Sequence, residues 1–167
     1  FIPLTIHIEI KKVYKSFQNK ILMSKKIENL YYTLVNDFKI TKPKMILAGI
    51  NPHAGENKTI SKDDNKYLLP IINLLKKRGL FIDGPVSGDG MINNQNLNYY
   101  DAFIFTYHDQ ALIPFKILSN YQGVNFTSNL DIIRVSPSHG TAENLIGSRK
   151  VISNGIINCF NLIKKIN

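Results

Sequence analysis

Apolar runs of strand length alternate along this chain with segments in which apolar residues recur at helical spacing. Residues 45–50 and 102–107 are nearly continuous apolar runs, a pattern typical of strands buried on both faces of a sheet. Residues 25–38 have helical periodicity, and Ser24 stands where a helix N-cap is expected. The pattern also predicts strands at 1–6, 80–82, 122–127 and 132–135, helices at 63–78, 143–147 and 155–166, and loops at 51–62 and 87–98. This alternation favours an α/β fold with a mainly parallel sheet flanked by helices.

The composition indicates a globular protein with a packed core. The chain has 167 residues and 44% hydrophobic content, which suits one domain or part of a two-lobed one. A net charge of +9 invites a nucleic-acid interpretation, but the basic residues are scattered over the polar faces of predicted helices. We therefore expect no nucleic-acid partner, although a positive field would attract an anionic substrate.

Targeting and redox signals are few. Cys159 stands alone among apolar neighbours, which favours a buried thiol in a reducing, cytoplasmic compartment. No apolar run approaches the roughly 18 residues of a membrane span, and no signal peptide is apparent. The chain opens with Phe1 inside a strand-like pattern, and we interpret it as a fragment of a longer protein.

Three histidines are the main candidates for chemistry. His53 and His108 each follow a predicted buried strand, at the edge of the sheet where ligands bind in open α/β folds. His7 ends the strand-like opening segment. Three neutral imidazoles that converge after folding form a metal site with open positions. A single histidine is more often an ordinary core or surface residue, so this hypothesis depends on their convergence.

Further polar residues fall within apolar sequence after His108. Lys116, Asn125 and Arg134 are donors suited to phosphate or carboxylate groups. A cation within an apolar strand is costly unless it is paired, so we expect Arg134 to meet an anion. The alternative is an internal salt bridge from Arg134 to Asp131 or Asp109.

A small-residue turn precedes the helix predicted at 143–147. It has the sequence Ser138-His139-Gly140-Thr141-Ala142, and a turn entering a helix N-terminus can bind an anion or a nucleotide. The signal is weak, because such turns are common. The chain has no G-x-G-x-x-G run, so the usual dinucleotide fingerprint is missing.

Taken together, these motifs resemble the 4-hydroxythreonine-4-phosphate dehydrogenase family of vitamin B6 biosynthesis. The matching stretches run in family order: LAGINPHAGE at 47–56, DGP at 83–85, YHDQ at 107–110, GVNFT at 123–127, IRVS at 133–136 and HGTA at 139–142. The family is about twice as long, so the resemblance implies that residues 1–167 are its C-terminal portion, with no separate second domain.

The resemblance implies an α/β fold like that of isocitrate and isopropylmalate dehydrogenases, incomplete because the N-terminal half is absent. It also implies a homodimer with its active site at the subunit interface, and a divalent metal (Zn, Mg or Co). His7, His53 and His108 resemble the metal ligands, and Lys116, Asn125 and Arg134 resemble the substrate-binding residues. The cofactor, NAD or NADP, is expected to contact His139, Gly140, Thr141 and Ala142.

The implied reaction is metal-assisted oxidation and decarboxylation of 4-phosphooxy-L-threonine to 3-amino-2-oxopropyl phosphate. Asp89 and Asp109 are both candidates for the proton acceptor, and the sequence does not separate them. A related dehydrogenase of a four-carbon sugar-acid phosphate shares every motif. A non-catalytic metal-binding remnant is the other alternative. No membrane partner is expected.

Overall fold

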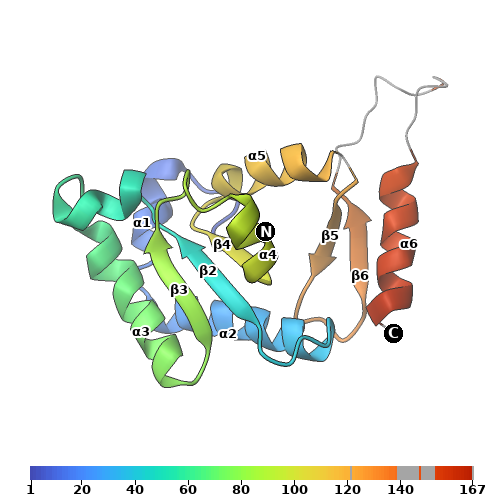
Figure 1. Ribbon diagram of the computed structural model, residues 1–167, viewed down its shortest axis with the longest axis horizontal. Coiled ribbons are helices and arrows are strands. Elements are labelled where there is room, and N and C mark those ends of the chain that lie inside the picture. Colours follow the sequence, from blue (N-terminus) through green and yellow to red (C-terminus); the bar gives the residue numbers. More distant parts are fainter. Residues whose placement is uncertain (121, 139–146, 148–152, 167) are drawn as a thin grey trace.

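A computed structural model describes residues 1–120, 122–138, 147 and 153–166 of the chain (Figure 1). Its strands are β1 (Ile2–Pro3), β2 (Lys44–Ala48), β3 (Phe81–Val86), β4 (Ala102–Phe105), β5 (Val124–Thr127) and β6 (Arg134–Pro137). Its α-helices are α1 (Val13–Ser16), α2 (Lys20–Asn36), α3 (Leu69–Lys77), α4 (Asn94–Tyr99), α5 (His108–Ser119) and α6 (Asn154–Ile166). Most predicted strands and helices are therefore present, and the expected α/β class is confirmed.

The main sheet has four strands in the order β1-β4-β2-β3, all parallel. The predicted strands at 45–50 and 102–107 are its two central strands, and every residue of β4 is buried. Parallel strands covered on both faces read as continuous apolar sequence, which explains why these two were the clearest in the sequence. The carboxyl ends of all four strands meet at one edge of the sheet.

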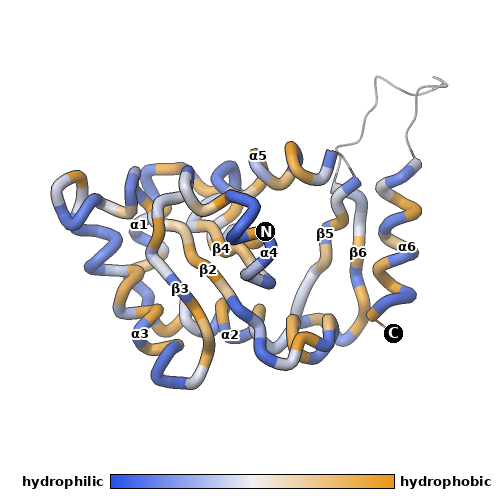
Figure 2. Tube along the Cα trace, viewed as in Figure 1, coloured by the Kyte–Doolittle hydropathy of each residue, from blue (hydrophilic) through white to orange (hydrophobic). Residues whose placement is uncertain are grey.

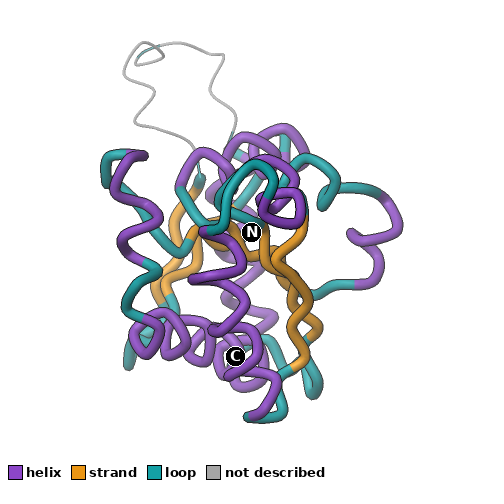
Figure 3. Tube along the Cα trace, turned by 90° about the vertical axis from the view of Figure 1, so that its left-hand side faces the viewer, coloured by secondary structure: helices purple, strands orange, loops and turns teal. Residues whose placement is uncertain are grey.

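Helices cover both faces of this sheet, and alternate strand residues belong to different cores (Figures 1 and 3). Met45 and Leu47 of β2 face the larger core, which includes buried residues of α2 and α3. Ile46 and Ala48 face the smaller core, together with Met91 and with residues of α4 and α5. The period-two alternation of a strand thus produces a three-layer arrangement of helix, sheet and helix.

The N-terminus of α2 lies earlier than the sequence pattern indicated. Asn19 is the N-cap, and its side chain accepts a hydrogen bond from the Leu22 backbone N–H at 3.0 Å. Ser24 lies inside the helix and is buried, so the prediction that Ser24 caps the helix was wrong. The extra turn was missed because Ile21 and Leu22 are exposed and do not continue the buried stripe.

Besides the short helix α1, two described helices occupy segments for which none was predicted. Helix α4 begins inside residues 87–98, which were expected to be a loop, and ends just beyond them at Tyr99. The Asn93 side chain caps this helix by accepting a hydrogen bond from the Asn96 backbone N–H at 2.9 Å. Helix α5 begins at His108 and contains Pro114. Asparagine-rich sequence in α4 and an internal proline in α5 both oppose intrinsic helix propensity, so packing on the smaller core stabilises these helices.

The hairpin of β5 and β6 forms a separate antiparallel sheet beside the main one, and α6 packs against it (Figure 1). Phe126 of β5 contacts Phe38, with ring centroids 5.1 Å apart, which joins the hairpin to the segment after α2. Figure 2 shows apolar and polar segments alternating along α6. Cys159 of α6 is buried as predicted, and burial raises the pKa of its thiol. Within the described ranges, each helix is too short or too polar to cross a membrane.

Candidate metal and substrate site at the carboxyl edge of the sheet

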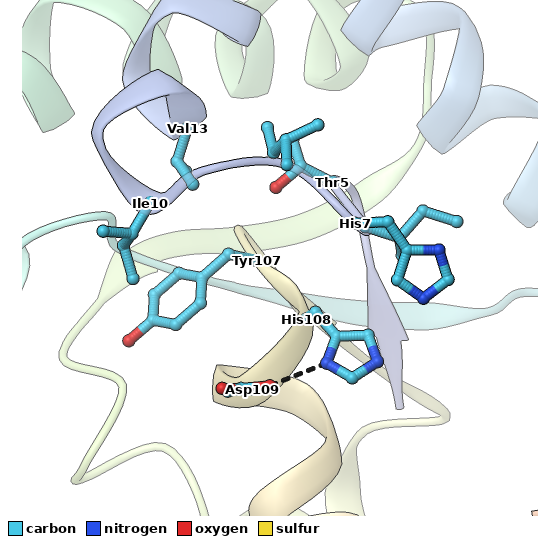
Figure 4. Close-up of a pocket in the computed structure, with 9 residues that line it drawn as sticks. Thr5, His7, Ile10, Val13, Tyr107, His108 and Asp109 are labelled. Atoms are coloured by element: carbon cyan, nitrogen blue, oxygen red, sulfur yellow. Dashed lines mark hydrogen bonds and ion pairs between the residues drawn. The ribbon is translucent and has the colours of Figure 1, made fainter.

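His7 and His108 lie side by side just beyond the ends of β1 and β4. Their ring centroids are 5.6 Å apart (Figure 4). The two segments are joined because the Leu4 backbone N–H donates to the Phe105 carbonyl at 2.8 Å, and the buried Thr5 hydroxyl donates to the Thr106 carbonyl at 2.7 Å. The pairing of neighbouring strands therefore continues past their ends and brings the two imidazoles together.

These two rings line a cleft of about 250 Å³. Its other walls come from the segment after β1 and from the start of α5, and include Tyr107 and Asp109 (Figure 4). The Nδ1 atom of His108 lies 2.7 Å from an Asp109 carboxylate oxygen. A carboxylate on one ring nitrogen orients an imidazole and leaves its other nitrogen facing outward, which is the usual arrangement behind a metal-binding histidine.

The backbone is strained at two of the three candidate ligands. His7 and His53 have φ angles of +47° and +51°, in the left-handed region that side chains with a Cβ rarely adopt. Around His53 the left-handed conformation continues through Asn57, so the expected loop at 51–62 contains a tight helical turn, Pro52–Lys58. Residues in this conformation are enriched at functional sites, although Lys39, Asn120 and Asn129 also adopt it here.

The turn that carries His53 is held in place by hydrogen bonds to the side chain of Asp64, which is fully buried. Its carboxylate accepts hydrogen bonds from the Ile50 backbone N–H at 2.7 Å and from the Asn51 side-chain amide at 2.8 Å. A Cβ on Gly49 would lie 2.8 Å from an Asp64 oxygen, so only glycine fits there. Asp64 was not singled out from the sequence, although an aspartate just before an apolar helix was a signal that could have identified it.

Gln110, of the YHDQ motif, joins the ends of the two central strands. Its side-chain oxygen accepts from the Thr106 backbone N–H at 2.9 Å, and its amide donates to the Gly49 carbonyl at 2.9 Å. The same amide nitrogen also packs closely against Gly88: a Cβ atom at position 88 would lie only 2.9 Å from it. Gln110 therefore sets the relative positions of the segments that carry His53, His108 and the turn after β3.

His53 faces the turn after β3 in the described part of the chain. The Ser87 hydroxyl lies 3.4 Å from His53 Nδ1 and also donates a hydrogen bond to the Asp89 carboxylate. This hydrogen bond holds the pKa of Asp89 below its ordinary value, with smaller contributions from backbone N–H groups and from the nearby His53. Asp89 is therefore ionised at neutral pH. Ser87 was not singled out from the sequence.

The three histidines do not form one cluster within a single chain. Among the residues that the structure describes, no group of three or more His, Cys, Asp or Glu side chains is close enough to hold a metal ion. One chain thus supplies the His7–His108 pair, with His53 beside Ser87. Paired imidazoles with a carboxylate behind one of them fit a divalent cation that prefers nitrogen ligands, and a third ligand from elsewhere would complete the site.

The three expected substrate-binding residues lie on separate elements: Lys116 on α5, Asn125 on β5 and Arg134 at the start of β6. All three are exposed, and none lines the cleft of His7 and His108. The expectation that Arg134 is a cation within an apolar strand was wrong, because β6 begins at this residue and leaves it in solvent. Its guanidinium donates to the Thr127 hydroxyl at 2.8 Å, and no ion pair to Asp131 or Asp109 is present among the described residues.

The predicted cofactor-binding turn, with His139, Gly140, Thr141 and Ala142, lies outside the described residues, as does nearly all of the helix predicted at 143–147. Their role remains a prediction from the sequence.

Comparison with known proteins gives consistent matches. The chain is 39% identical over 149 residues to 4-hydroxythreonine-4-phosphate dehydrogenase of Zymomonas mobilis. This alignment covers 89% of this chain and 44% of that protein. It is 36% identical over 165 residues to the protein of the same name from Roseobacter denitrificans, covering 99% of this chain and 48% of that protein. The chain thus spans about half the length of the curated relatives it matches.

The solved structures that match this chain include proteins of the same name. A 4-hydroxythreonine-4-phosphate dehydrogenase from Burkholderia phymatum matches with a TM-score of 0.77 at 33% identity, over 98% of this chain and 48% of that one. The enzyme of this name from Klebsiella pneumoniae gives 0.80 at 28% identity, with the same coverage. The family model described as pyridoxal phosphate biosynthetic protein PdxA matches residues 1–163. The chain therefore belongs to the PdxA family.

Proposed function

We propose that this protein is a metal-dependent, NAD(P)-linked 4-hydroxythreonine-4-phosphate dehydrogenase of vitamin B6 biosynthesis. The observation that carries the proposal is the His7–His108 pair at the carboxyl edge of the sheet, in a chain of the PdxA family. The activity and the phosphorylated, threonine-like substrate are those for which the relatives are named. The substrate is 4-phosphooxy-L-threonine, and the product after loss of carbon dioxide is 3-amino-2-oxopropyl phosphate.

The proposed metal site is shared between two subunits of a homodimer. His7 and His108 come from one chain, and His53 of the partner subunit supplies the third imidazole. Support comes from the separation of His53 from the other two within one chain. Apolar side chains left exposed on α5 and α6, such as Ile117 and Phe160, offer contact area for a second copy. A set of imidazole ligands favours Zn²⁺ or Co²⁺ over Mg²⁺, which prefers oxygen.

The residues of this chain then have distinct roles in the reaction. When bound, a divalent cation supplies Lewis acidity at the secondary hydroxyl of the substrate, and a nicotinamide cofactor supplies the hydride acceptor. Asp89 or Asp109 receives the proton of that hydroxyl; both carboxylates lie beside a candidate metal ligand. Lys116, Asn125 and Arg134 bind the anionic groups of the substrate and so fix its orientation.

The proposal is tested by steady-state assay with 4-phosphooxy-L-threonine, Zn²⁺ or Co²⁺, and NAD or NADP. A four-carbon sugar-acid phosphate serves as the competing substrate. Metal-dependent reduction of the cofactor with the threonine derivative supports the proposal. A preference for the sugar-acid phosphate, or no turnover with either compound, contradicts it.

Replacing Arg134 with alanine is expected to raise KM for the substrate about tenfold or more, with a smaller effect on kcat. The reason is that one charge-assisted hydrogen bond to an anionic group contributes about 1.5–3 kcal/mol. Arg78→Ala is the matched control, because Arg78 is likewise an exposed arginine, is paired with Glu28 and does not line the cleft of His7 and His108. An unchanged KM in Arg134→Ala, or an equal rise in both variants, contradicts a role in oxyanion binding.

A further inference from the structure

Ser87 stands between an imidazole and a carboxylate. Its hydroxyl oxygen lies 3.4 Å from His53 Nδ1, and the same hydroxyl donates to Asp89. The turn that carries Ser87 is held in place, since β3 pairs with β2 and the neighbouring Gly88 packs against the Gln110 side chain. The three groups thus form a short hydrogen-bonded chain whose geometry is set by the fold.

The number of available protons determines which group donates in each of these two hydrogen bonds. An ionised carboxylate can only accept hydrogen bonds, so the single hydroxyl proton of Ser87 points to Asp89. Ser87 can then only accept from His53. The hydrogen on the His53–Ser87 contact therefore belongs to Nδ1 of the imidazole, and the lone pair of the neutral ring is on Nε2.

We propose that Ser87, oriented by Asp89, is a positioning residue that fixes His53 in the Nδ1–H tautomer and presents its Nε2 lone pair to a cation. This inference rests on the proposed function, because it assigns His53 to the metal site. Metal-bound histidines are commonly oriented in this way by an acceptor on the other ring nitrogen, and loss of the acceptor weakens metal binding about 10–100-fold.

The same tautomer is expected at His108, whose Nδ1 atom contacts a carboxylate directly rather than through a hydroxyl group. Its Nδ1 lies 2.7 Å from an Asp109 carboxylate oxygen, which again can only accept. Asp109 thus orients His108 directly, whereas Asp89 orients His53 through a hydroxyl group. The two imidazoles, from different elements, are prepared for binding through the same ring nitrogen, Nε2.

The tautomer is measured by two-bond ¹H–¹⁵N correlation spectra of the metal-free protein with ¹⁵N-labelled histidine, at mildly alkaline pH. The chain has only four histidines, and His53→Gln identifies the signal of His53. We expect the Nδ1–H pattern for His53 in the unmodified protein. Ser87→Ala should move His53 toward the Nε2–H form, which free imidazole side chains prefer, and Ser87→Thr should restore the original pattern because it keeps the hydroxyl.

Zn²⁺ titration without substrate or cofactor gives an independent measurement. Ser87→Ala should weaken Zn²⁺ binding about 10–100-fold, whereas Ser128→Ala, an exposed serine in the turn between β5 and β6, should leave both the tautomer and the affinity unchanged. An Nε2–H pattern for His53 in the unmodified protein, or an unaltered pattern in Ser87→Ala, overturns the inference. If the tautomer shifts as expected but the protein has no dehydrogenase activity, the proposed function fails and the role of Ser87 stands.

Discussion

Replacing His108 with alanine is expected to lower metal-dependent turnover by about 100-fold or more. Lewis-acid stabilisation contributes several kcal/mol to a transition state, and each 1.36 kcal/mol corresponds to about a tenfold change in rate. His108 faces His7 across the cleft, with ring centroids 5.6 Å apart, so its loss leaves a single imidazole on this side of the proposed site. The measurement is kcat/KM with saturating Zn²⁺, together with the zinc content of the purified protein by elemental analysis.

The fold should survive this replacement. His108 is the first residue of α5, is partly exposed, and contacts Asp109 rather than the core. Asn94→Ala is the matched control, since Asn94 is likewise the first residue of a helix and is exposed, but does not line the cleft. It should retain both activity and zinc. Unchanged zinc content in His108→Ala would show that this ring is not a ligand.

Replacing Asp64 with alanine is expected to destabilise the protein by about 3 kcal/mol. The substitution leaves two hydrogen-bond donors, Ile50 N–H and the Asn51 amide, without their acceptor, and each such loss costs about 1–3 kcal/mol when the group is buried. For a chain of this size that corresponds to a fall in Tm of roughly 5–10 °C. Because the same hydrogen bonds fix the turn that carries His53, zinc affinity should fall as well. Thermal and urea denaturation give the stability.

Asp63→Ala provides the control for Asp64. Asp63 is adjacent and also acidic but only partly buried, and its backbone N–H, which alanine retains, donates a hydrogen bond to the Ser61 hydroxyl. Its Tm should change little. The Asp64→Asn variant keeps one acceptor oxygen, so its Tm should lie between those of Asp63→Ala and Asp64→Ala. Equal stability of the Asp63 and Asp64 alanine variants would contradict the assignment of Asp64 as the support of this turn.

The sequence predicted best those elements that are buried on both sides. β2 and β4 appeared as apolar runs because neither face meets water, and α6 appeared because its apolar residues recur with helical period. Helices α4 and α5 were missed because their stability comes from contacts with the sheet rather than from local propensity. The predicted start of α2 was wrong because Ile21 and Leu22 in its first turn are exposed, although Met23 in the same turn is buried.

For the site, the sequence indicated residue types and strand ends but not the supporting contacts. His53 and His108 follow buried strands, as predicted, and the pairing of β1 with β4 explains the proximity of His7 to His108. The roles of Ser87 and Asp64 depend on contacts with residues 34 and 14 positions away, which no local pattern reveals. Arg134 is exposed despite its apolar sequence neighbours, because Ile132 and Ile133 before it are themselves exposed.

Mixing subunits tests the shared metal site most directly. His53→Ala and His108→Ala chains are each expected to lack zinc and activity, but a hybrid dimer of the two contains one site with all three imidazoles. Zinc binding and dehydrogenase activity should therefore return when the two variants are unfolded and refolded together. His7→Ala mixed with His108→Ala should recover neither, because both rings belong to the same side of the site. If the first mixture stays without zinc and activity, the proposed site between subunits is contradicted.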